Sequence, residues 1–113
     1  MPEQIQLDDE DAKIVTLARS SRARTQAAEG AAVRDTDGRT YAAATVALPS
    51  LSLTALQAAI AAAVSSGAEG IEAAAVVTAS EVTPESVRAV RDLAEKAPIY
   101  VADARGTVTE VIG

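Results

Sequence analysis

The chain has 113 residues, a net charge of −6 and a pI of about 4.5, and it contains no histidine and no cysteine. These absences exclude thiolate and imidazole metal sites, iron–sulfur clusters, cysteine nucleophiles and Ser-His-Asp triads. The acidic charge argues against binding to nucleic acid or to an anionic membrane surface. The length is that of one domain, so we treat residues 1–113 as a single domain.

Alanine dominates the hydrophobic residues, while phenylalanine and tryptophan are absent. Alanine favours helices but buries little apolar area, which gives a monomer a thin core. Either the helices pack very closely or the chain self-associates, and we favour a homo-dimer or homo-tetramer. The apolar stretches fall short of the about 20 residues that span a bilayer. The segment 1–6 lacks the features of a signal peptide, so we expect a cytoplasmic protein without membrane partners.

The first predicted element is a helix from Asp8, a good N-cap residue, to about Arg24. Its acidic start could be regarded as a metal site, but we interpret it as a charged first turn that suits the positive helix end. The only basic cluster consists of Arg19, Arg22 and Arg24, which complement the negative end of the same helix.

A β-hairpin and a second helix follow. Residues 30–35 are predicted to form a strand, 36–38 a turn with an Asp-Gly signal, and 39–46 the returning strand. After a loop over 48–53, Ser52 is expected to cap a helix that ends at Gly67. Its predicted apolar stripe consists of Leu53, Leu56, Ile60 and Val64.

The second half of the chain alternates strand, helix, strand and strand. Residues 71–78 form an apolar run that is typical of a central strand covered on both faces. Thr83 as N-cap and Pro84 in the first turn predict the start of a helix. Residues 99–103 and 107–112 are predicted strands around a tight turn, the last of them an edge strand. Because a helix joins strands 71–78 and 99–103, these two strands should be parallel.

The predicted order is therefore α-β-β-α-β-α-β-β, an α/β fold with helices on the faces of a mixed five-stranded sheet. Several local segments match motifs of a known protein family, and they occur in the same order along the chain. The segment 30–41 contains Gly-Ala-Ala, an Asp-Gly turn and a tyrosine, and the segment 55–67 ends in Ala-Val-Ser-Ser-Gly. Thr83-Pro84 opens the next helix, and Ala104-Arg105-Gly106 forms a short turn between the last two strands.

From about Lys13 to Ile112, these features resemble the homotetrameric type of cytidine deaminase. The first segment is similar to that family's first hairpin, and the second is similar to its zinc-site helix. Thr83-Pro84 falls where the family's P-C-x-x-C helix starts. The resemblance implies a cytidine deaminase-like three-layer α-β-α sandwich that assembles as dimers of dimers.

The resemblance also implies that the family's zinc site is degenerate here. In the family, a thiolate-held zinc activates water, and a glutamate outside the metal shell transfers protons. The C-A-E motif falls on Thr54, Ala55 and Leu56, and the two cysteines of P-C-x-x-C fall on Glu85 and Arg88. Leucine transfers no proton, threonine is a poor zinc ligand and arginine repels a cation. We therefore expect no catalytic residue, no metal and no cofactor.

The nucleoside-binding motif N-x-E of the family falls on Thr45, Val46 and Ala47, so its carboxylate is absent. Thr45 and Ala47 are therefore degenerate nucleoside-binding positions. Shifting the alignment does not restore a site, because no cysteine or histidine is present in any register.

The remaining polar residues allow two interpretations of the old site. Thr54, Ser86, Glu85 and Arg88 should gather near two helix N-termini, which attract anions, so a small anion or phosphate site is conceivable. We favour the other interpretation, in which Glu85 and Arg88 form a solvent-facing ion pair in the first helical turn. For Glu81, which could pair with Glu85, we favour a structural role.

Three functions follow, in order of preference. The first is a catalytically inactive deaminase-like protein that acts through self-association and binding of an unidentified protein partner. The second is a small-ligand or anion-binding module that uses the old pocket. The third is an active cytidine deaminase-type hydrolase.

Overall fold

The computed structural model describes residues 5–113. Residues 1–4 lie outside the described residues, and they include most of the segment 1–6 in which we expect no signal peptide. The helices are α1 (Asp9–Thr25), α2 (Ala55–Ser65) and α3 (Pro84–Leu93). The strands are β1 (Glu29–Asp35), β2 (Thr40–Ala44), β3 (Val46–Leu48), β4 (Leu51–Leu53), β5 (Ile71–Thr78), β6 (Ile99–Ala102) and β7 (Val108–Ile112). Within residues 5–113, each helix is too short or too polar to cross a membrane.

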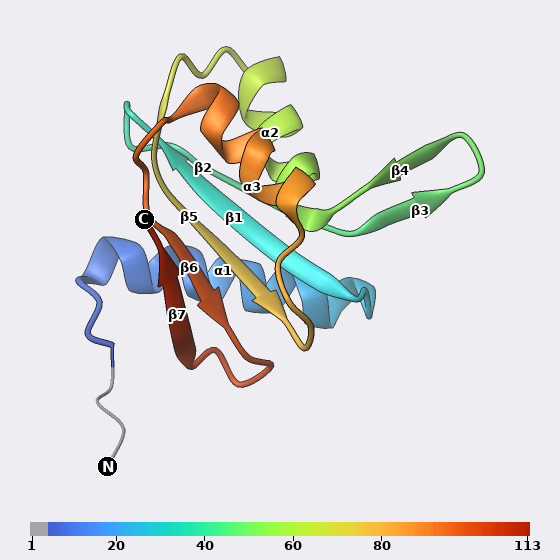
Figure 1. The fold of residues 1–113 in the computed structure, drawn as a ribbon, viewed down its shortest axis with the longest axis horizontal. Helices are drawn as coiled ribbons and strands as arrows, with labels where there is room; N and C mark the ends of the chain where they lie inside the picture. The colour runs from blue at the N-terminus through green and yellow to red at the C-terminus, as the bar shows by residue number, and fades with distance from the viewer. Residues whose placement is uncertain (1–4) are drawn as a thin grey trace.

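Five strands form one mixed sheet in the order β2-β1-β5-β6-β7. β5 and β6 are parallel, and the other neighbours are antiparallel. Helix α1 covers one face, and α2 and α3 cover the other, as Figure 1 shows. The predicted three-layer α/β architecture is confirmed, including the central position of β5, its parallel pairing with β6 and the edge position of β7.

The two faces of the sheet carry separate cores. Ile14 and Ala18 of α1 pack with small residues of β1 and β5, whereas Leu56 of α2 and Val90 of α3 belong to the core on the opposite face. Close approach compensates for small side chains on the α1 side. A Cβ at Gly30 would lie 2.0 Å from the carbonyl oxygen of Ala18, so only glycine lets β1 lie this close to the helix.

Two hairpin turns, β1–β2 and β6–β7, have the same construction. In each, the first residue is an aspartate, Asp35 or Asp103, whose Oδ1 accepts the backbone N–H groups two and four residues later at 2.9–3.1 Å. The fourth residue, Gly38 or Gly106, has a φ of 84° or 85°, a conformation that favours glycine. The predicted turns at 36–38 and 104–106 are thus confirmed.

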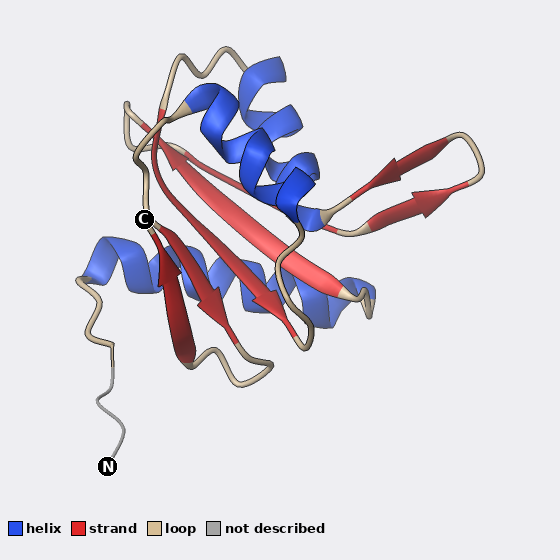
Figure 2. Cartoon of the chain, in the orientation of Figure 1, coloured by secondary structure: helices blue, strands red, loops and turns tan. Residues whose placement is uncertain are grey.

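The chain between β2 and α2 differs from the prediction. The segment 48–53 is not a plain loop, because β3 and β4 form a hairpin that extends away from the body, as Figure 2 shows. We call residues 46–53 the arm. The predicted strand 39–46 accordingly divides into β2 and the start of β3.

The predicted cap and stripe of the second helix are partly wrong. Ser52 lies in β4, and the N-cap is Thr54, because its side chain accepts the N–H of Gln57 at 3.2 Å while Gln57 reaches back to the Thr54 N–H. Leu53 also lies in β4. Val64 is 52% exposed, because the buried stripe runs through positions 56, 59, 60 and 63 and leaves Val64 at its edge.

Candidate functional site

Helices α2 and α3 begin next to one another, and hydroxyl groups fill the space between their N-termini. Ser86, in the first turn of α3, is 2% exposed and donates its Oγ–H to Thr54 Oγ1 at 2.7 Å. Thr83, the N-cap of α3, has its Oγ1 3.0 Å from Ser86 Oγ. The structure therefore brings Thr54 and Ser86 together across 32 residues of sequence.

The other three positions that the sequence predicts to be degenerate catalytic positions have different surroundings. Leu56 is fully buried in the core beneath the α2 N-terminus. Glu85 and Arg88 are exposed, and the predicted ion pair between them is wrong: in residues 5–113, the ion pairs within 4.0 Å both involve Arg34. A hydrogen bond from the Thr83 side chain lowers the pKa of Glu85, and a hydrogen bond from the backbone N–H of Glu85 itself contributes a smaller lowering.

Of the two predicted degenerate nucleoside-binding positions, Thr45 lines the same cavity as Thr54 and Ala47 does not. The Thr45 backbone N–H donates to the Glu29 carbonyl oxygen at 3.1 Å, and the Glu29 N–H donates to Thr45 Oγ1 at 3.0 Å. Thr45 and Thr54 line one cavity of about 250 Å³. Ala47 is exposed on β3 and does not line that cavity.

Hydroxyl-bearing side chains dominate this cavity, which we call the hydroxyl cavity. They come from the arm, the ends of β2 and β5 and the two helix starts: Thr45, Ser52, Thr54, Thr78, Ser80 and Thr83. Glu29 and Glu81 add carboxylates. Our sequence reasoning missed Thr78 and Ser80, although their position at and just after the carboxyl end of a buried strand is where α/β folds commonly place functional side chains.

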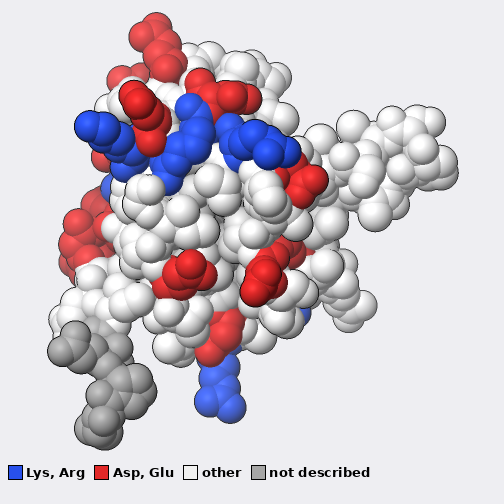
Figure 3. Space-filling model, viewed as in Figure 1, with Lys and Arg blue, Asp and Glu red and all other residues white. Residues whose placement is uncertain are grey.

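A second cavity of about 410 Å³ shares Thr78, Ser80 and Glu81 with the hydroxyl cavity and extends to Asp103 and Glu110. Figure 3 shows the corresponding face of the molecule: basic side chains gather over the α3 layer, while the lower half carries mostly acidic ones. The polar region beside the helix starts is therefore acidic rather than basic, which opposes the anion-site interpretation.

The donor set between the helix starts does not fit zinc. Zinc sites in proteins use thiolate, imidazole and carboxylate ligands. Here the convergent groups are neutral hydroxyls already engaged in a helix cap and in one another, and residues 5–113 contain no group of three acidic side chains arranged to hold a metal.

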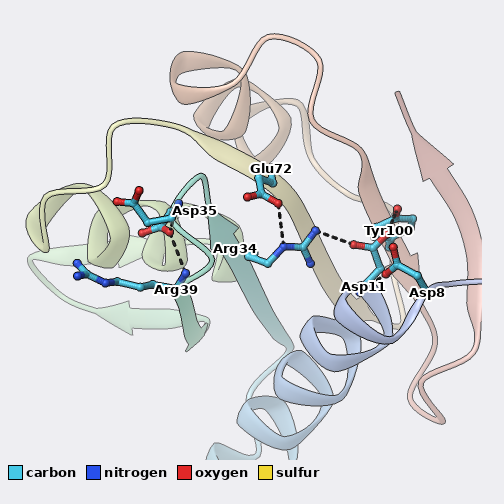
Figure 4. Close-up of polar contacts among 8 residues, drawn as sticks. Asp8, Asp11, Arg34, Asp35, Arg39, Glu72 and Tyr100 are labelled. Atoms are coloured by element: carbon cyan, nitrogen blue, oxygen red, sulfur yellow. Dashed lines mark hydrogen bonds and ion pairs between the residues drawn. The ribbon is translucent and has the colours of Figure 1, made fainter.

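A partly buried ionic network on the other face of the sheet was also missed by the sequence reasoning (Figure 4). Arg34 of β1 donates from Nη2 to Asp11 at 3.0 Å and from Nε to Glu72 at 3.2 Å. Tyr100 of β6 donates to Asp11 at 2.6 Å. Burial would lower the pKa of the Arg34 guanidinium, but these two carboxylates outweigh it and raise the pKa. The network joins α1 to three strands, so its role is structural.

Comparison with known proteins places these features in context. A family model described as "Cytidine deaminase-like" matches residues 7–106. Among solved structures, the cytidine deaminase from Burkholderia pseudomallei has a TM-score of 0.76 and 21% identity, covering 89% of this chain and 90% of that one.

Two mycobacterial structures are also similar. The cytidine deaminase from Mycobacterium leprae has a TM-score of 0.67 and 18% identity over 79% of this chain and 85% of that one. A mutant cytidine deaminase from Mycobacterium tuberculosis has a TM-score of 0.59 and 22% identity over 76% and 82%. No curated protein matches the sequence significantly. At these identities, the structural similarity establishes the fold alone.

Proposed function

The chain belongs to the cytidine deaminase-like family, and from this premise we propose that it is a catalytically inactive member that acts through self-association and protein binding. The observation that carries the proposal is the 2.7 Å hydrogen bond from Ser86 to Thr54. It occupies Thr54, one of the three positions at which the family resemblance implies zinc ligands, with a neutral hydroxyl partner, and the other two positions carry the exposed Glu85 and Arg88. The buried Leu56 offers no proton acceptor next to these hydroxyls.

The arm supports a function through association. Its sequence, VALPSLSL, carries no charge, and Leu48 and Leu51 near its tip are 60% and 50% exposed. A two-stranded hairpin standing apart from a sheet is marginally stable by itself. We infer that these leucines become buried against a second copy of the chain or a protein partner, which would add apolar burial to an alanine-rich core.

A second candidate function is binding of a small neutral polar ligand in the hydroxyl cavity. Its hydroxyl lining favours this ligand class, because hydroxyls both donate and accept hydrogen bonds. Glu29 and Glu81 disfavour an anion there. A ligand of this kind would be compatible with an inactive site.

Two measurements on the same preparation test the inactive assignment. Protein purified without chelator should contain no stoichiometric zinc after dialysis, and it should not deaminate cytidine or deoxycytidine, as followed by absorbance. The Glu81→Gln and Glu85→Gln variants serve as controls. Deamination by this chain should change when a carboxylate beside the helix starts is removed, whereas deamination by a contaminating enzyme should not. About one zinc per chain, or deamination that scales with protein and changes in either variant, would establish the active hydrolase instead.

A further inference from the structure

We propose that a cavity on the α1 face, which shares no lining residue with the hydroxyl cavity, binds a small organic phosphate. This cavity of about 400 Å³ lies between the C-terminal half of α1 and the β6–β7 turn. It is lined by Arg19, Arg22, Ala23, Gln26, Ala27, Val77 and Ala104. Val77 lies at the carboxyl end of β5 and Ala104 in the turn after the parallel strand β6, at the edge where open α/β sheets bind ligands.

A backbone hydrogen bond positions Arg22 of this cavity, and Arg19 lies beside the β6–β7 turn. The Nε–H of Arg22 donates to the carbonyl oxygen of Ala28 at 3.1 Å, which holds its guanidinium at the end of α1. The backbone of Arg22 lies directly over Gly30, where an added Cβ would come within 2.7 Å of the Arg22 nitrogen. The Cδ of Arg19 lies against Gly106, at 3.3 Å from a Cβ placed there. Gly30 thus lets the helix backbone at Arg22 approach β1, and Gly106 leaves room beside the Arg19 side chain.

The charge of the cavity is unbalanced. Arg19 and Arg22 are three residues apart on one helix, where like charges repel, and neither has a carboxylate partner within 4.0 Å in residues 5–113. The cavity lining contains no acidic residue, although the chain carries a net charge of −6. The α1 C-terminus contributes about half a negative charge, which two guanidinium groups exceed. A bound anion would remove the repulsion.

Phosphate suits this arrangement better than carboxylate. Each guanidinium can donate two parallel hydrogen bonds, and a single carboxylate is satisfied by one such fork, whereas a phosphate dianion can accept from both. The small apolar side chains of Ala23, Ala27, Val77 and Ala104 leave space beside the arginines, and Gln26 offers an amide. We therefore assign the ligand class as a phosphate monoester with a compact organic group.

Titration by amide NMR at constant ionic strength tests the proposal, with glycerol 3-phosphate as the probe. Saturable shifts should centre on the amides of residues 22–27, 77 and 104, and glycerol should cause none. Arg19→Gln and Arg22→Gln should each raise the Kd about tenfold. The matched control is Arg24→Gln, which removes the same charge from the same helix outside the cavity lining and should change the Kd less than about twofold.

Three results would overturn the proposal. An equal loss of affinity in Arg24→Gln would mean general charge attraction, shifts elsewhere would mean another site, and succinate binding as tightly as the phosphate would refute the ligand class. Arg22→Gln also removes the hydrogen bond to Ala28 and could disturb the helix end. Arg19 has no side-chain hydrogen bond within residues 5–113, so unchanged affinity in a folded Arg19→Gln protein is decisive against the site.

Discussion

The Arg34 guanidinium and the Asp11 carboxylate form an ion pair at 3.0 Å between β1 and the first turn of α1, with only 10% and 14% of their side chains exposed. Asp11 therefore forms a tertiary ion pair in addition to any favourable interaction with the helix dipole. Its second oxygen accepts the Tyr100 hydroxyl, so one carboxylate connects the helix to two strands that are not neighbours in the sheet.

Removing this carboxylate should be costly. Asp11→Ala leaves the Arg34 charge largely buried with only Glu72 as a partner, and we expect the free energy of unfolding to fall by about 3 kcal/mol. Urea denaturation measures the change. Asp9→Ala is the control, because Asp9 lies in the same helical turn and is exposed. If both variants lose the same stability, the helix dipole rather than the ion pair is responsible.

The same contact determines the titration of Tyr100. Burial, followed by the hydrogen bond to Asp11 and its negative charge, raises the pKa of Tyr100 to about 12. The neutral phenol is thus favoured in the folded protein, and the stability it contributes is complete below pH about 10 and is lost as the pH rises from about 10 towards 12.

The phenolate absorbance of Tyr41→Phe should report Tyr100 alone, because the chain has only two tyrosines and no tryptophan. We expect little ionisation at pH 10 while circular dichroism shows the fold intact, and half-ionisation near pH 10 in concentrated urea. Half-ionisation near pH 10 in the folded protein would show that the hydroxyl does not contact Asp11.

The arm should control the oligomeric state. We expect a dimer or tetramer by light scattering at micromolar concentration, and Leu48→Ser with Leu51→Ser should convert it to a monomer because both side chains are exposed on the arm. The body should keep its circular dichroism spectrum, since the arm is not part of the five-stranded sheet. Val64→Ser is the control for loss of an exposed apolar side chain elsewhere. A monomeric unmodified protein would remove this support for the proposed function.

We expect that substitutions can build a zinc site between the helix starts. The changes Thr54→Cys, Leu56→Glu, Glu85→Cys and Arg88→Cys supply three thiols and the proton-transferring carboxylate, and helix N-termini lower thiol pKa values. Since Ser86 now contacts Thr54, we expect tighter zinc binding when Ser86→Ala is added. Zinc should raise the melting temperature of this variant and leave that of the unmodified protein unchanged. A folded variant without zinc affinity would show that positions 54, 85 and 88 do not converge.

Local sequence was sufficient for much of the fold. The apolar run of β5, the Asp-Gly turn at 37–38 and the Thr83-Pro84 helix start were readable because each depends on backbone preferences and periodicity within a few residues. The absence of histidine and cysteine likewise limited the chemistry without any structure. The arm was not predicted, because each of its two strands has only three residues and neither alternates between buried and exposed positions.

Contacts between distant segments were decided by tertiary structure alone. Ser86 and Thr54 are 32 residues apart, Arg34 and Asp11 are 23 apart, and no local pattern distinguishes these residues from ordinary surface hydroxyls and charges. These contacts form because the sheet order brings two helix starts together and places β1 beneath the first turn of α1. A sequence specifies such pairs only through the packing of the whole chain, because the free energy of a hydrogen bond or ion pair depends on burial that local residues do not determine.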